Sequence, residues 1–283
     1  MKKLLIFLSV FICTHGIYSQ DDLLATIDKQ DTVNTVSAAF KGLKIVNFES
    51  TKMVNKNEFY FIVSHRFGSI KNGFDDFFGL DFAFTRLHFL YGFSDGFNLA
   101  IARSSFNKTY DISAKYRFVQ QKENFPITIV GYTQMAFNTF LNDGVLSREV
   151  TMGDRVSFTQ QVLISKKVNE NVSIQLMPTY FYEGYVDYAP QDNSQFALGF
   201  GGRLKLNKRF SLNLDYGWHL NRASGSPFVN PLSIGVDIET GGHVFQLHFT
   251  NAQPTFESGF LGNGIGDWSD GNIYFGFNLS RVF

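Results

Sequence analysis

The sequence predicts an all-β protein, a transmembrane antiparallel β-barrel of about twelve strands. Three observations predict it: apolar and polar side chains that alternate with period two, runs of about ten residues, and an even number of such runs. Strands of soluble sandwiches are usually about 5 or 6 residues long, whereas a tilted strand needs about 9 to 11 residues to cross a bilayer. Beyond the N-terminal region no window holds about 18 successive apolar residues, which excludes membrane-spanning helices.

The alternation is clearest in residues 210–221. Apolar or aromatic side chains occupy every second position from Phe210 to Leu220, and polar or small ones such as Asn213 and Asp215 lie between them. A strand with this pattern turns one face to lipid and the other to a polar interior. Twelve runs share the pattern, at about 58–67, 81–93, 97–104, 109–120, 125–138, 155–168, 171–183, 194–206, 210–221, 231–239, 243–250 and 272–283. Closed antiparallel bacterial barrels require such an even number.

The connections between the runs alternate in length. Short turns rich in turn-forming residues lie at 94–96, 121–124, 169–170, 207–209 and 240–242. Longer connections lie between them at 68–80, 139–154, 184–193, 222–230 and 251–271, with 105–108 as a short exception. We therefore expect the short turns and both termini in the periplasm, and the longer loops outside the cell.

The strand register can be predicted at one turn. A three-residue turn at 207–209 pairs Leu204 with Leu212 and Leu198 with Trp218. Apolar side chains then meet on one face and polar ones on the other, as the pleat of a sheet requires.

The last run alternates from Ile273 to the terminal Phe283. A strand that ends in a C-terminal Phe resembles the signal read by the barrel assembly machinery, so we predict this machinery and membrane lipid as partners. Arg281 falls on the lipid side by parity, which its place in the last turn near the interface allows.

The chain begins with the pattern of a secretory signal peptide. Two lysines precede an apolar stretch from Leu4 to Cys13, and a cleavage site is expected just before Gln20. The predicted division is a signal peptide at 1–19, an N-terminal segment at 20–57 and an outer-membrane β-barrel at 58–283. The segment 20–57 is polar and alternates only weakly, so we expect it either to plug the lumen or to lie in the periplasm.

The composition excludes several classes of function. The 25 Lys and Arg residues balance 25 Asp and Glu residues without a basic run, so we expect no nucleic-acid partner. Cys13, the only cysteine, lies in the predicted signal peptide, so the exported chain has no disulfide and no thiolate metal site. No pattern indicates a cofactor, and the glycines and aspartates of 259–271 match neither a calcium loop nor a nucleotide site.

Two strings of residues carry a family resemblance. Ser-His-Arg-Phe-Gly at 64–68, and Arg-Ser-Ser followed by Lys-Thr-Tyr-Asp within 103–111, are similar to an uncharacterised β-barrel family of Bacteroidetes outer membranes. The likeness covers roughly residues 58 to 283. It implies a barrel in the outer membrane, and it implies no settled activity.

Charged and histidine side chains fall on the polar faces of the runs, so we expect them to line the lumen. The predicted lumen-lining residues are Arg66, Arg86, His88, Asp111, Lys115, Arg117, Arg203, Lys205, Asp215 and His219. Under one interpretation, charges of both signs pair and keep the interior hydrated. Under a sharper hypothesis, Arg66, Arg86, Lys115 and Arg117 form a basic stripe that selects an anionic solute.

These observations predict an outer-membrane channel or transporter for a small solute. The first alternative is a non-conducting barrel whose outer loops, notably 68–80, contact a partner. The second is an outer-membrane hydrolase, whose candidate cluster is His65 beside Ser64, with Ser104 or Ser105 two strands away. Neighbouring side chains of a strand point to opposite faces, and no Gly-x-Ser-x-Gly motif occurs, so we expect no enzymatic activity.

Overall fold

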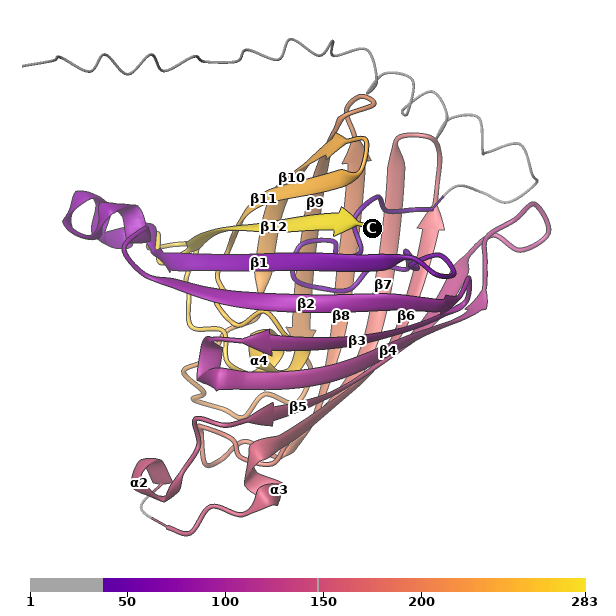
Figure 1. Ribbon diagram of the computed structural model, residues 1–283. Helices are drawn as coiled ribbons and strands as arrows, with labels where there is room; N and C mark the ends of the chain where they lie inside the picture. Colours follow the sequence, from indigo (N-terminus) through magenta and orange to yellow (C-terminus); the bar gives the residue numbers. More distant parts are fainter. Residues whose placement is uncertain (1–37, 147) are drawn as a thin grey trace, which may run out of the picture.

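Twelve antiparallel strands close into a barrel in the computed structural model, which describes residues 38–146 and 148–283 (Figure 1). The strands are β1 (Phe59–Ser69), β2 (Ala83–Ser94), β3 (Phe97–Ser104), β4 (Thr109–Val119), β5 (Thr128–Asn138), β6 (Val156–Lys167), β7 (Val172–Glu183), β8 (Ser194–Lys205), β9 (Phe210–His219), β10 (Leu232–Thr240), β11 (His243–Thr250) and β12 (Tyr274–Val282). Each strand pairs with its neighbours along the chain, and β1 pairs with β12 to close the sheet. The predicted fold class is therefore confirmed. The predicted signal peptide at 1–19 lies outside the described residues.

The strand positions and the tested register agree with the sequence pattern. Each predicted run matches an observed strand to within about three residues at either end. Between β8 and β9, Leu204 lies opposite Leu212 and Leu198 lies opposite Trp218, as predicted. Period-two alternation fixes the register here because a slip by one residue would turn apolar side chains into the lumen.

The two ends of the barrel carry different connections. Short turns join the strands at one end, where Phe283 exchanges backbone hydrogen bonds with Phe59. The helical segments of the described residues belong to the connections of the other end, which are long except for 105–108. They are η1 (Ile70–Gly79), η2 (Phe106–Lys108), α2 (Asp143–Leu146), α3 (Met152–Arg155) and α4 (Glu257–Gly262). None of these helices is long and apolar enough to cross a membrane.

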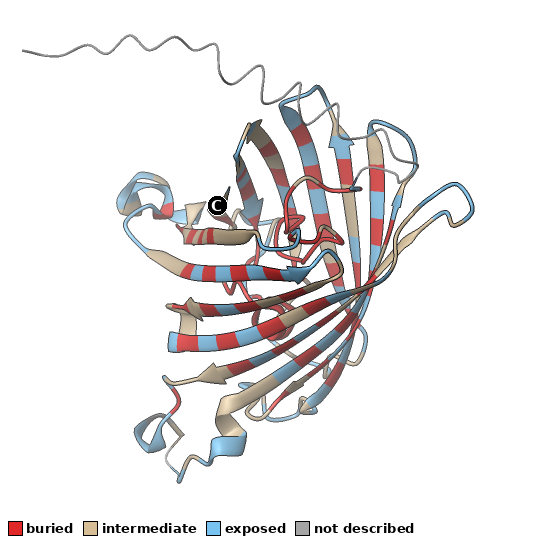
Figure 2. Cartoon of the chain, turned by 45° about the vertical axis from the view of Figure 1, so that its right-hand side comes forward, coloured by how far each residue is buried: buried red, intermediate tan, exposed pale blue. Residues whose placement is uncertain are grey.

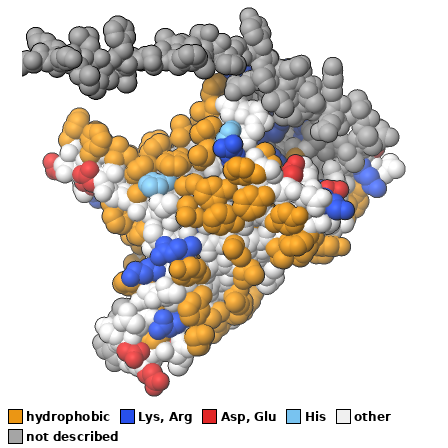
Figure 3. Space-filling model, viewed as in Figure 1, with side chains coloured by type: hydrophobic (Ala, Val, Ile, Leu, Met, Phe, Trp, Pro, Cys, Tyr) orange, Lys and Arg blue, Asp and Glu red, His pale blue; other side chains and the backbone are white. Residues whose placement is uncertain are grey.

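Burial alternates along every strand because successive side chains point to opposite faces of the sheet. Bands of buried and exposed residues follow one another along the ribbons in Figure 2. On β9, Ser211, Asn213 and Asp215 are buried, whereas Leu212 and Leu214 are exposed. Hydrophobic side chains cover much of the outer face in Figure 3, as contact with lipid requires.

Two segments outside the barrel wall fill the interior. Residues 39–54 are buried apart from the partly exposed Lys41 and Lys52, and they run inside the barrel before β1 begins (Figure 1). The connection between β11 and β12 also turns inward, and all six residues of α4 are buried. The first segment leads into β1 at the end with the short turns, and the second comes from the opposite end.

A positive charge at the middle of the lipid-facing surface should destabilise the barrel. We expect Leu214→Arg, in the middle of β9, to lower the free energy of unfolding by about 2–4 kcal/mol. Phe210→Arg, on the same face but at the first residue of β9, should cost only about 0–1 kcal/mol because the side chain reaches the interface. Denaturant unfolding in lipid vesicles measures both values, and equal losses would contradict the assigned lipid-facing surface.

Candidate functional site

The candidate site is the lumen, together with the part of the N-terminal segment that occupies it. We call residues 38–54 the inner segment and its turn at 44–49 the tip. The tip is a tight reversal, because Ile45 donates its backbone N–H to Phe48 O at 2.8 Å and Ser50 donates to Leu43 O at 2.9 Å. These bonds satisfy only part of the backbone, so the rest of the tip must find partners on the barrel wall.

One carboxylate of the wall binds three backbone groups of the tip. Asp215 Oδ2 accepts the N–H groups of Val46 at 3.0 Å, Asn47 at 2.7 Å and Phe48 at 3.1 Å. Successive N–H groups that converge in this way form an anion-binding concavity. Asp215 is fully buried, so these bonds replace the water that an ionised carboxylate needs.

Polar side chains on neighbouring strands of the wall hold the same turn. Arg66 Nη2 donates to Asn47 Oδ1 at 2.9 Å, and Asn278 Nδ2 donates to the carbonyl oxygen of Val46 at 3.0 Å. The amide of Asn47 donates in turn to Ser233 Oγ at 2.9 Å. The tip is therefore bound by β1, β9, β10 and β12, which belong to one continuous side of the barrel.

A buried ionic cluster joins the inner segment to β4 and α4. Glu49 lies 2.8 Å from Lys44 Nζ and 2.7 Å from Lys115 Nζ. Lys44 Nζ also lies 3.6 Å from Glu257 in α4, and the hydroxyl of Tyr132 donates to Glu257 at 3.1 Å. All of these side chains are buried, so each charge depends on its partners rather than on water.

The two segments that enter the lumen also share an apolar contact. The rings of Phe48 in the tip and Phe260 in α4 pack edge to face with centroids 4.8 Å apart. Together with the Lys44–Glu257 pair, this contact closes the space between the two segments.

A second buried ion pair lies within the wall itself. Arg86 Nη2 is 2.6 Å from Asp111 Oδ1, and Gln134 Nε2 donates to the same oxygen at 3.0 Å. Arg86 Nη1 also donates to the carbonyl oxygen of Thr255, just before α4. The Arg86–Asp111 ion pair does not depend on the inner segment. Lys115 does depend on it, because its carboxylate partner is Glu49.

Apolar side chains of the wall also contact the inner segment, although they lie on faces that the alternation predicts to be polar. Leu43 and Val54 pack on Ile62, Leu90 and Ala100, all on the inner face of β1 to β3. A larger cluster joins side chains of the inner segment, the wall and the β11–β12 connection. It contains Ala39, Phe40, Ile45, Phe48, Met53, Val130, Tyr132, Leu163, Met177, Phe181, Ala197, Ala252, Phe260 and Leu261. A water-filled lumen gives such inward apolar residues no partner, so their presence is a signal in the sequence.

Glycines on the inner face of β8 and β9 make room for the tip. A Cβ on Gly199 would lie 2.8 Å from the ring of Phe48, and one on Gly217 would lie 2.8 Å from Leu261. A Cβ on Gly201 would overlap the end of Ile45. These positions therefore act as sockets for the side chains of the inner segment and of α4.

The structure places most of the predicted lumen residues inside the barrel and two at its mouth. Arg66, Arg86, His88, Asp111, Lys115, Arg203, Asp215 and His219 are buried. Arg117 and Lys205 are only partly buried and lie at the strand ends next to the short turns. The four residues of the predicted basic stripe thus do not share one environment, since three contact the lumen contents and Arg117 lies near the mouth.

Two other predicted lumen residues, Arg203 and His219, contact side chains of neighbouring strands. Arg203 donates to Ser211 Oγ at 2.7 Å and lies 3.3 Å from Glu239. His219 Nε2 is hydrogen-bonded to Gln195 at 2.8 Å. Among the described residues, neither ring nitrogen of His88 has a hydrogen-bond partner.

Ser64 and His65, the residues considered for a hydrolase, lie on opposite sides of the wall. Ser64 is buried in the lumen. His65 faces outward, where its Nδ1 lies 2.9 Å from Thr85 Oγ1 and its ring stacks on Phe277. The two side chains therefore cannot act on one substrate as a nucleophile and its base.

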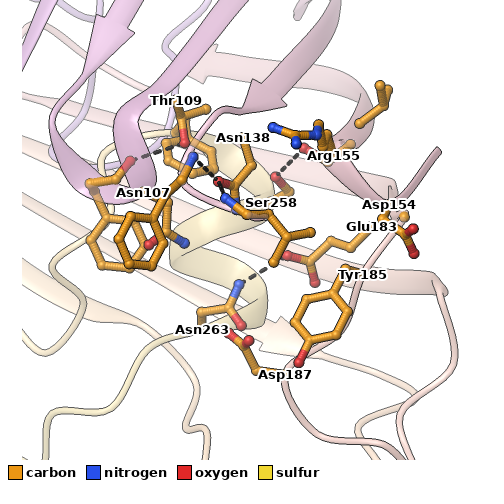
Figure 4. A pocket seen from close by; sticks show the side chains of 17 residues that line it. Asn107, Thr109, Asn138, Asp154, Arg155, Glu183, Tyr185, Asp187, Ser258 and Asn263 are labelled. Carbon is orange, nitrogen blue, oxygen red and sulfur yellow. Dashed lines mark hydrogen bonds between the residues drawn. The ribbon is translucent and has the colours of Figure 1, made fainter. Parts of the chain in front are cut away.

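A small cavity of about 150 Å³ lies at the end with the long connections, between the ends of β4 to β7 and α4 (Figure 4). Glu183 and Asn263 point toward each other in Figure 4, and Asn263 Nδ2 donates to Glu183 at 2.9 Å. Asp154, also in the lining, is bound by Arg148 in the adjacent loop. The hydrogen bond from this guanidinium holds the pKa of the Asp154 carboxyl below its usual range.

The chain belongs to a family described as a membrane-bound beta barrel domain (DUF5777), which it matches over residues 40–283. The match confirms the predicted membership of a β-barrel family without an assigned function. It also begins inside the inner segment, so nearly all of that segment belongs to the domain itself.

Several solved structures are similar to this chain at low identity. The NanC porin is 11% identical with a TM-score of 0.49, and the match covers 79% of this chain and 98% of that one. The KdgM porin is 8% identical with a TM-score of 0.45, covering 80% and 98%. The outer membrane protein Omp33 of Acinetobacter baumannii is 9% identical with a TM-score of 0.44, covering 81% and 99%. Likeness at this level does not carry a function from one protein to another. No curated protein matches the sequence.

Neutralising Glu49 should release the inner segment. Glu49→Gln leaves Lys44 and Lys115 buried without their shared carboxylate, which costs about 3–5 kcal/mol. We expect amide hydrogens of residues 43–54 to exchange at least a hundredfold faster than in the unmodified protein, with strand amides unchanged.

The matched control is Asp154→Asn, which removes an ion pair of the exposed loop. Its effect on exchange within the inner segment should be undetectable. Unchanged protection of residues 43–54 in Glu49→Gln would show that the ionic cluster does not hold the segment.

Proposed function

We propose that this protein is an outer-membrane channel for a small solute, closed in the described conformation by the inner segment and opened when that segment leaves the lumen. The observation that carries the proposal is the way the tip is bound. Asp215, Arg66, Lys115 and Asn278 hold it through polar contacts with the lumen wall. Such groups are suited to water as well as to the tip, so the wall can be hydrated when the segment is absent.

The inner segment can leave without opening the barrel. The closed ladder of twelve strands contains none of its residues. The segment joins the barrel covalently at β1, and Asn57 and Lys56 anchor that junction through Gly92 O and Asp95 at the mouth. Displacement therefore breaks the tip contacts but exposes no strand edge. The connection that contains α4 would remain as a constriction.

Departure of the segment changes the charges that line the lumen. Lys115 would lose Glu49 and Arg66 would lose Asn47, whereas Arg86 would keep Asp111. Two basic groups on the β1 to β4 side would then be exposed to a passing solute. This exposure supports the anionic solute as the sharper form of the proposal.

The remaining sequence-based predictions fit this proposal. A signal peptide at 1–19 would deliver the chain to the periplasm, and recognition by the barrel assembly machinery through the strand ending at Phe283 stays a prediction. The origin of the protein in Bacteroidetes also stays a prediction. The proposal assigns the protein no enzymatic activity.

A non-conducting barrel is the second candidate function. The apolar cluster that spans the wall, the inner segment and α4 favours it, since a permanently filled interior would be stabilised by such packing. Under this alternative the loops and outer face would carry the function. Conductance separates the two candidates.

Crowding the socket of the tip should open the channel. Gly201→Val places a branched side chain where Ile45 packs, so we expect single-channel recordings in planar bilayers to show steady conductance that the unmodified protein lacks. Gly202→Val is the matched control, because a Cβ at Gly202 meets nothing within 4 Å. Silence in both variants would favour the non-conducting barrel.

Selectivity can be tested in the same open background. Adding Lys115→Gln and Arg117→Gln to Gly201→Val removes two positive charges from the lumen and its mouth. The reversal potential in a salt gradient should then shift toward cation preference. An unchanged reversal potential would reject the basic stripe as the selecting element.

A further inference from the structure

Two polar side chains lie in the middle of the lipid-facing surface. Thr133 and Gln160 are exposed on the outer face of β5 and β6 and lie opposite each other in the ladder. Gln160 Nε2 donates to Thr133 Oγ1 at 2.6 Å. Because Thr133 is the middle residue of β5, the pair lies at the depth of the hydrocarbon core.

The pair leaves hydrogen-bonding groups of Gln160 unsatisfied. Among the described residues, Gln160 Oε1 accepts no hydrogen bond, and one amide hydrogen has no acceptor. A polar group without a hydrogen-bond partner is destabilising in hydrocarbon, because no water is present to bind it. At comparable depth on β9 to β11 the outward residues are apolar, as Leu214, Val236 and Leu247 are. The polar pair is therefore a local feature of one side of the barrel.

The same side of the barrel is hollowed. A groove of about 710 Å³ runs over the outer faces of β4 to β8, reaches Phe97 of β3 and Leu220 beyond β9, and contains both Thr133 and Gln160. Gly131 and Ala114 provide little side chain at its floor. Aromatic and aliphatic side chains line its sides. They are Phe97, Tyr116, Phe118, Tyr180, Phe196, Leu198 and Leu220.

We propose that this groove is the interface with a second copy of the chain, related by a two-fold axis along the membrane normal. Such an axis brings Gln160 of each copy to the same depth, where each amide N–H can donate to the other Oε1. The copy thus supplies the donor and the acceptor that Gln160 lacks. A lipid acyl chain can fill the groove but offers neither group.

A second polar pair of the outer face, on β1 and β2, is satisfied within the barrel itself. His65 and Thr85 are bonded to each other at 2.9 Å, and the His65 ring lies flat on Phe277 with centroids 5.2 Å apart. Both side chains therefore have partners within their own barrel. The proposal is independent of the channel function.

Cysteine cross-linking of the full-length protein tests the interface directly. With Cys13 replaced by Ser, Val162→Cys places a thiol in the groove, and Val236→Cys places one on the apolar face across the barrel. Mild oxidation in lipid vesicles should cross-link Val162→Cys into a covalent dimer and leave Val236→Cys monomeric. Equal cross-linking of the two variants, or none in either, would overturn the proposal.

Gln160→Leu provides the second arm, because leucine is compatible with the lipid-facing surface and leaves the barrel fold intact. We expect the dissociation constant of the dimer, measured by sedimentation in density-matched detergent, to rise by about tenfold, the effect of losing two hydrogen bonds in hydrocarbon. The same association in the variant as in the unmodified protein would overturn the role of Gln160. A monomer with phospholipid bound in the groove would overturn the second copy as its occupant.

Discussion

The arrangement of the lumen depends on the buried carboxylate of Glu49, which lies between Lys44 and Lys115. Neither lysine can remain charged in the interior without a partner. The position of Glu49 therefore determines whether Lys115 on β4 has a counter-ion. Lys44 extends the same cluster to Glu257 and thus to α4. One carboxylate therefore couples the barrel wall to both segments that fill it.

Shape and charge restrict the inner segment together. The sockets at Gly199 and Gly201 accept the side chains of the tip, while Asp215 binds its backbone. The apolar contacts are non-directional and fill space, whereas the hydrogen bonds and ion pairs set the orientation of the tip. The polar wall groups that bind the segment can be hydrated, or can contact a solute, once the segment has left the lumen.

The wall of this barrel could be predicted from the sequence, but its contents could not. Alternation defined the strands and the register of Leu204 with Leu212 because a strand has a strict period of two. The tip binds Asp215 through backbone N–H groups, which every residue but proline carries, so no side-chain pattern marks positions 46–48 as its partners. The inward position of Ile62 and of Leu90 was the available signal, since an apolar residue on a polar face indicates contact with another part of the chain.

The most direct test of the account is the single-channel conductance of the mature chain beside that of a chain lacking residues 20–54, which retains the junction at Asn55 to Asn57. The account predicts a silent mature chain and steady conductance after the deletion, with circular dichroism of both chains typical of a β-barrel. Equal conductance in the two chains would contradict the inner segment as the closing element. Silence in both would contradict the channel itself.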